Sequence, residues 1–187
     1  MKIFGVGLQR TGTTSLASMM LQLGFRTCHF ALHDEIFDQA DAVFDTPVYA
    51  RYQELDIKYP GAKFILTTRD PDAWLASFKR TICSMKGFNP LRPTSPNYLS
   101  YQKVFGTTDV MHNDAQLRLK FIEHEITVKE YFMRRPADLL TLTIDKLSND
   151  EMWAQVCSFV DKEQQGAYPT ITNPRHWGSV KHPLKIE

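Results

Sequence analysis

The sequence predicts one α/β domain, residues 1–187, in which a parallel sheet is flanked by helices on both faces. Short runs of β-branched and aromatic residues alternate along the chain with longer helix-like stretches. Strands that alternate with helices in this way assemble into a parallel sheet. The length of 187 residues fits a single domain, and a hydrophobic content of 43% can fill its core.

Each element has a local signal. Apolar runs predict strands at 2–6, 25–30, 42–46, 63–68 and 139–144. Helices are expected at 13–23, where Gly24 ends the helix, at 48–58, after Asp70 and Pro71, at about 109–133, and at 151–160.

Two long segments of the second half have distinct patterns. Residues 84–107 are rich in Pro, Asn, Ser and Gly and are expected to be irregular. In the helix that follows, apolar residues recur at helical spacing and predict one stripe along it: Met111, Ala115, Leu119, Ile122 and Ile126.

Composition argues against several classes of partner. A net charge of +1 gives no electrostatic basis for binding nucleic acid. No stretch approaches the roughly 20 apolar residues of a membrane span. Three cysteines, Cys28, Cys83 and Cys157, are widely spaced and form no CxxC pair, which argues against a disulfide framework or a metal site. We therefore expect a cytoplasmic protein without a bound metal.

The stretch "FGVGLQRTGTTS" has the spacing of a phosphate-binding loop. Gly7 and Gly12 have the Walker A separation and Thr14 fills its hydroxyl position, but Thr13 stands where the lysine belongs. Arg10 supplies a cation earlier in the loop, and a guanidinium can grip a phosphate or sulfate with two hydrogen bonds. Because the loop leads from a strand into a helix, we expect an anion site there. Its expected residues are Gln9, Arg10, Thr11, Gly12, Thr13, Thr14 and Ser15.

A second anion anchor is expected in "RDPDAWLAS". Arg69 follows a strand, so it lies at the same edge of the sheet as the first loop. Ser77 falls about two helical turns further on, on the face that also carries Asp70 and Trp74. An arginine and a serine placed in this way can converge on one phosphate group.

Together, the two anchors resemble those of the P-loop sulfotransferases, and "VFDTP", "YPGAKFILTTRDPDAW" and "VMHNDAQ" are most similar to a small subgroup of that family. The resemblance covers residues 1 to about 160. It implies a three-layer P-loop fold and the donor 3′-phosphoadenosine 5′-phosphosulfate. The first loop would hold the 5′-phosphosulfate, and Arg69 and Ser77 the 3′-phosphate. The acceptor would be a hydroxyl or amine of a small molecule or a glycan.

Sulfuryl transfer needs a base for the acceptor proton, and the sequence leaves this residue open. His29 ends one expected strand and Asp45 ends another, which places both beside the loop. His33 and His112 are the other candidates. Arg10 would stabilise the charge that builds on the leaving phosphate.

Two other functions remain open at this stage. In a P-loop kinase or hydrolase, "AVFD" would supply a magnesium aspartate, although the missing lysine at position 13 argues against this reading. In a non-catalytic nucleotide-binding module, the phosphate sites would remain without turnover. A homodimer that completes the acceptor pocket is also left open.

Overall fold

The computed structural model describes residues 1–84, 96–106, 113–164, 166, 168, 177 and 182–186. Five parallel strands form one sheet in the order β2-β3-β1-β4-β5. This confirms the predicted parallel sheet. The strands are β1 (Ile3–Gly5), β2 (Thr27–Cys28), β3 (Ala42–Val43), β4 (Lys63–Thr68) and β5 (Leu139–Thr143).

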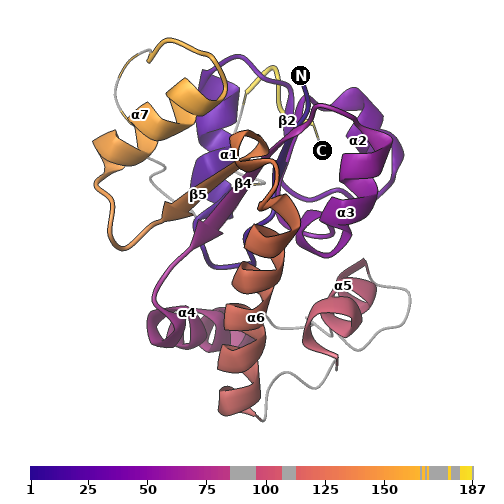
Figure 1. Ribbon diagram of the computed structural model, residues 1–187, viewed down its shortest axis with the longest axis vertical. Helices are drawn as coiled ribbons and strands as arrows, with labels where there is room; N and C mark the ends of the chain where they lie inside the picture. Colours follow the sequence, from indigo (N-terminus) through magenta and orange to yellow (C-terminus); the bar gives the residue numbers. More distant parts are fainter. Residues whose placement is uncertain are drawn as a thin grey trace.

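Helices cover both faces of the sheet, which confirms the three-layer α/β arrangement (Figure 1). The helices are α1 (Thr13–Gln22), α2 (Glu35–Gln39), α3 (Val48–Lys58), α4 (Pro71–Ser84), α5 (Pro96–Phe105), α6 (Asp114–Phe132) and α7 (Asn149–Phe159), with a short 3-10 helix at Pro136–Asp138. Buried side chains of α1 and α7 pack on one face of the sheet. Those of α2, α3 and the C-terminal half of α6 pack on the other.

The alternation of β1 shows how the sequence builds these layers. Ile3 packs with the cluster beneath α1 and α7, whereas Phe4 packs with the cluster beneath α3 and α6. Both are fully buried, as expected for the central strand of a sheet that is covered on both sides. A third cluster unites α3, α4, α5 and the first half of α6, and Figure 1 shows the last three gathered below the sheet.

The expectation of an irregular segment over 84–107 is wrong in part. Helix α5 occupies 96–105 and buries Tyr101 and Phe105 against Phe78 and Trp74 of α4. The aromatic residues drive this helix to pack, and their burial outweighs the poor helix signal of the surrounding sequence.

The predicted stripe of the long helix does not face the core. Leu119, Ile122 and Ile126 are 53%, 40% and 49% exposed. The buried face carries a second set at helical spacing: Leu117, Phe121, His124, Val128 and Phe132. Both sets have the right period, and the set with the two phenylalanines buries more apolar area, so it packs inward. Met111 lies outside the described residues.

The topology places the carboxyl ends of all five strands at one edge of the sheet. The loop after β1 emerges there between the ends of its neighbours β3 and β4. Ligands of open parallel sheets bind beyond this edge. No helix in the described part of the chain is long and apolar enough to cross a membrane.

Candidate functional site

The glycine loop, residues 7–12, is held in a conformation that depends on its glycines. A Cβ atom on Gly7 would lie 2.5 Å from the backbone oxygen of Thr67, so only glycine fits against β4 at this point. Gly12 has φ of 89° and Arg10 has φ of 72°, both in the left-handed region. An arginine in this region is uncommon, and such strain concentrates at ligand sites.

Helix α1 begins directly after the loop, and no side chain caps its first turn. The N–H groups of Thr13, Thr14 and Ser15 belong to this turn, where backbone donors lack helical partners. Together with the helix dipole, these groups form a site for an anion at the end of the loop. This is the strand–loop–helix context in which the sequence predicted an anion site.

On one side of the loop, His29 and Asp45 meet the first hydroxyls of α1. The Nε2 atom of His29 lies 3.2 Å from Thr13 Oγ1 and 3.1 Å from Thr14 Oγ1. Thr13 Oγ1 donates a hydrogen bond of 3.1 Å to Asp45 Oδ2, which lies 3.7 Å from His29 Nε2. His29 and Asp45, both candidates for the general base, therefore lie in one cluster with Thr13 and Thr14.

Burial and charge act in opposite directions on His29. Burial lowers the pKa of its imidazole below the ordinary value, and the carboxylate of Asp45 partly offsets this. The imidazole is therefore neutral at neutral pH and able to accept a proton. Asp45 has φ of 62° and is held by the backbone N–H of Thr46, which donates to its Oδ1 atom at 2.7 Å. The ring of Trp177 lies against that of His29, with centroids 5.5 Å apart.

On the other side of the loop, Arg10 joins the second anchor. Its Nε atom donates a hydrogen bond of 3.2 Å to Ser77 Oγ, and Arg69 Nη1 donates to the backbone oxygen of Arg10 at 3.4 Å. The Nε atom of Arg69 is buried and has no hydrogen-bond partner among the described residues. The two arginines and the serine thus form one cationic cluster, here called the arginine cluster.

Two of the predicted loop residues turn their side chains away from the anion position. Gln9 Nε2 donates to Thr46 Oγ1 and to the hydroxyl of Tyr49, at 2.9 and 2.8 Å. The hydroxyl of Thr11 is fully buried and donates to the backbone oxygen of Leu8 at 2.6 Å. These side chains stabilise the loop. Gln9 and Thr11 would therefore contact an anion through their backbone N–H groups.

Three further residues hold the loop, and the sequence did not identify them as loop contacts. The indole N–H of Trp74 donates to the backbone oxygen of Gln9 at 2.9 Å. Thr67 Oγ1 lies 2.7 Å from Thr11 Oγ1. The hydroxyl of Tyr49 accepts a hydrogen bond from the side-chain amide of Gln9. The contact of Thr67 with the loop could have been expected, because Thr67 is a polar residue near the carboxyl end of β4, the strand next to β1. Nothing local in the sequence marks Trp74 or Tyr49 as loop contacts.

A cavity of about 140 Å³, the loop cavity, opens beside the start of α1. Its lining is mainly apolar and comes from α1, the ends of β4 and β5, and α7: Gly12, Ser15, Leu16, Met19, Thr67, Leu142, Ile144, Met152 and Tyr168. Ser15 and Tyr168 share a side-chain hydrogen bond. The cavity offers apolar walls immediately next to the anion donors of α1.

The structure therefore brings nearly all of the predicted site residues to one edge of the sheet. His29, Asp45, Thr13 and Thr14 gather on one side of the loop, and Arg10, Arg69 and Ser77 on the other. His33 is exposed in the turn before α2. His112 lies outside the described residues.

The fold and this site define an α/β protein with an anion-binding glycine loop at the carboxyl edge of its sheet. The sequence profile of the sulfotransferase domain family matches residues 2–33 and 30–176. The chain belongs to this family, as the sequence resemblance indicated.

One curated relative is Ava biosynthesis cluster protein M of Aspergillus versicolor, which is 32% identical over 115 residues. The match covers 46% of this chain and 44% of the relative, so it spans less than half the relative's length. The family supports a sulfotransferase-type function for this chain.

Proposed function

We propose that the chain transfers a sulfuryl group from 3′-phosphoadenosine 5′-phosphosulfate to a hydroxyl or amine of a small-molecule or glycan acceptor. The observation that carries this proposal is the arginine cluster. Arg10 extends from the glycine loop to Ser77, beside Arg69, and so joins two anion positions in one cationic surface. A ligand with two separate phosphate groups matches such a surface better than a ligand with a single phosphate chain.

The residues fit this donor on three counts. The uncapped first turn of α1 can hold a 5′-phosphosulfate. Arg69 carries a buried Nε–H without a partner among the described residues, which a 3′-phosphate oxygen would satisfy. The loop cavity has apolar walls for a nucleobase next to the anion donors. When bound, the donor supplies the sulfuryl group and a bisphosphate leaving group.

We assign His29 as the general base that takes the proton of the acceptor. Its Nε2 atom faces the hydroxyls of Thr13 and Thr14 at the mouth of the loop, and burial keeps the imidazole neutral. The carboxylate of Asp45, 3.7 Å away, stabilises the imidazolium that results. Arg10 and the backbone donors of α1 neutralise negative charge on the phosphate side.

Two features argue against a kinase. Thr13 takes the place of the lysine that such enzymes place on their β- and γ-phosphates. The Asp45 carboxylate, which would have to serve magnesium, already accepts hydrogen bonds from Thr13 and Thr46.

The test is a turnover assay in which the donor is incubated with the protein and a panel of phenols, alcohols, amines and glycans. We expect acceptor-dependent release of adenosine 3′,5′-bisphosphate. His29→Gln should slow it by roughly 10²- to 10⁴-fold, the usual contribution of a general base. His33→Gln, an exposed histidine four residues on, is the matched control and should keep full activity. Donor binding without transfer to any acceptor would instead indicate a non-catalytic module.

A further inference from the structure

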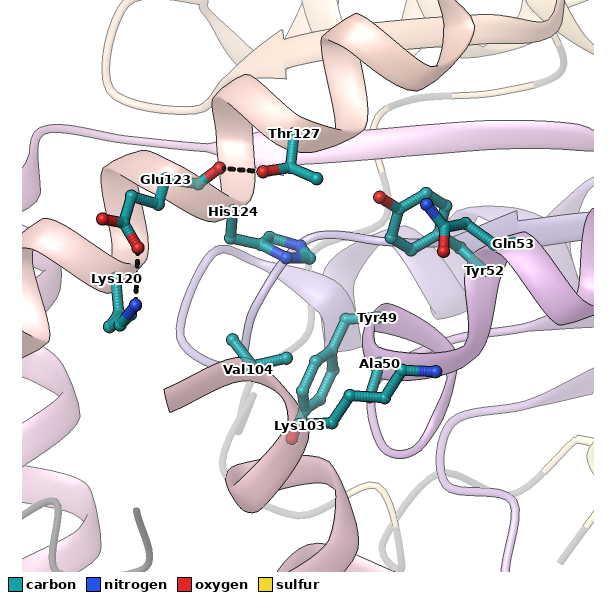
Figure 2. A pocket seen from close by; sticks show the side chains of 10 residues that line it. All are labelled: Tyr49, Ala50, Tyr52, Gln53, Lys103, Val104, Lys120, Glu123, His124 and Thr127. Atoms are coloured by element: carbon teal, nitrogen blue, oxygen red, sulfur yellow. Dashed lines mark hydrogen bonds and ion pairs between the residues drawn. The ribbon is translucent and has the colours of Figure 1, made fainter. Parts of the chain in front are cut away.

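A second cavity, of about 210 Å³, lies between α3, α5 and α6 and shares no lining residue with the loop cavity. Figure 2 shows its wall, with the ring of His124 extending from α6 toward Tyr49 and Tyr52 of α3. Among the described residues, its lining includes Tyr52, Lys103, Val104, Lys120 and His124. The residues assigned to the sulfuryl donor do not line this cavity.

The geometry of His124 fixes the hydrogen-bonding character of the cavity. The residue is only 9% exposed, and its Nε2 atom lies 2.8 Å from the backbone oxygen of Val6. A carbonyl oxygen only accepts, so Nε2 carries the proton and Nδ1 is an acceptor. No described residue donates to Nδ1. Burial also lowers the pKa of this imidazole, which keeps the ring neutral.

The other polar groups of the wall are largely engaged. The hydroxyl of Thr127 donates to the backbone oxygen of Glu123 at 2.8 Å. Lys120 is paired with Glu123, and Lys103 is paired with Glu54, at 2.8 and 2.7 Å. The charges at the rim are therefore balanced, and the lining gives no preference for a strongly charged ligand.

Aromatic and aliphatic side chains make up the rest of the wall. The rings of Tyr49 and Tyr52 stand nearly perpendicular to that of His124, with centroids 6.3 and 6.4 Å away. Ala50 and Val104 add aliphatic surface. Since an engineered apolar cavity of about 150 Å³ in another protein holds benzene, the cavity of about 210 Å³ has room for a slightly larger flat ring system.

We propose that this cavity is a second small-molecule site, for an uncharged, flat aromatic ligand that carries one N–H or O–H donor. The donor group pairs with Nδ1 of His124, and the ring lies against Tyr52, which keeps part of its surface exposed. The site is separate from the donor site, and His124 links it to the backbone that leads into the glycine loop through Val6.

Indole and benzothiophene test the proposal because they have nearly the same shape and only indole has an N–H. Calorimetric titration of the full chain should show one-to-one binding of indole, roughly 3- to 10-fold tighter than benzothiophene, as one hydrogen bond contributes. Saturating adenosine 3′,5′-bisphosphate should leave the indole site in place. Equal affinity for the two probes, no binding of either, or displacement of indole by the bisphosphate overturns the proposal.

Two variants and one control locate the ligand. Val104→Trp fills the cavity from α5 and should abolish indole binding, whereas Leu99→Trp, on the exposed face of the same helix, should not. His124→Phe keeps a ring at this place and removes the acceptor Nδ1, so it should remove the preference for indole over benzothiophene. Unchanged binding in Val104→Trp, or an unchanged preference in a folded His124→Phe, contradicts the assignment.

Discussion

Replacing Arg69 by alanine separates the two anion positions of the proposed donor site. In the free protein this side chain makes a long hydrogen bond of 3.4 Å to the backbone oxygen of Arg10, and its buried Nε–H has no partner among the described residues. Its removal therefore costs the fold little. In the complex, the guanidinium would make charge-assisted hydrogen bonds to the 3′-phosphate, worth about 1.5–3 kcal/mol in total.

That free energy corresponds to roughly 10- to 150-fold weaker binding of adenosine 3′,5′-bisphosphate in Arg69→Ala. Adenosine 5′-phosphate, which lacks the 3′ group, should bind the variant and the wild type within about twofold. Isothermal titration with both nucleotides measures the difference directly. Ser77→Ala should show the same selectivity on a smaller scale, because a neutral hydroxyl contributes about 0.5–1.5 kcal/mol.

Arg80→Ala is the matched control, since Arg80 is an exposed arginine on the same helix, α4. It removes the same charge from the chain and should change neither affinity. Equal losses for the two nucleotides in Arg69→Ala would refute the assignment of Arg69 to the 3′-phosphate. They would indicate that the arginine acts through the conformation of the glycine loop instead.

Three other measurements test separate parts of the structure. The acid limb of kcat/KM should lie below pH 6.5, the ordinary pKa of histidine, because burial lowers the pKa of His29 and the base must be unprotonated. Asp45→Asn should move this acid limb to lower pH, because the carboxylate of Asp45 raises the pKa of His29. If the acid limb persists in His29→Gln, His29 is not the base. Gly7→Ala should lower the thermal midpoint by roughly 2–12 °C, because overpacking against Thr67 costs about 1–3 kcal/mol, and an unchanged midpoint contradicts the close approach. Ser148→Ala removes the capping box of α7 and should lower the midpoint by roughly 2–4 °C without changing nucleotide affinity, so altered affinity would argue against a purely structural role.

The sequence predicted the part of the site that depends on strand ends. His29, Asp45 and Arg69 each follow a strand of a parallel sheet, and the carboxyl ends of such strands share an edge whatever the details of packing. The glycine loop was predictable for a similar reason, because its spacing has meaning only between a strand and a helix.

Side-chain direction was not predictable in the same way. The sequence placed Arg10 in the loop, but the contact of its guanidinium with Ser77, 67 residues away, depends on tertiary packing. Gln9 likewise turns toward Tyr49 because Thr46 and Tyr49 offer it buried partners.

Helix α6 shows the limit of periodicity. Its sequence carries two apolar faces with the same helical spacing, so the period alone does not say which one is buried. Phe121 and Phe132 decide it through their greater buried area. The same packing buries His124 and leaves Leu119 exposed, neither of which the pattern of the sequence indicated.

Thermal unfolding with adenosine 3′,5′-bisphosphate, and in parallel with ATP and magnesium, tests the donor site most directly. A ligand at 100 times its dissociation constant adds about 2.7 kcal/mol to the free energy of unfolding. For a chain of 187 residues this raises the midpoint by roughly 5–10 °C. We predict such a rise with the bisphosphate and none with ATP and magnesium. A rise with ATP and magnesium alone would contradict the proposed sulfuryl donor and favour a kinase or hydrolase.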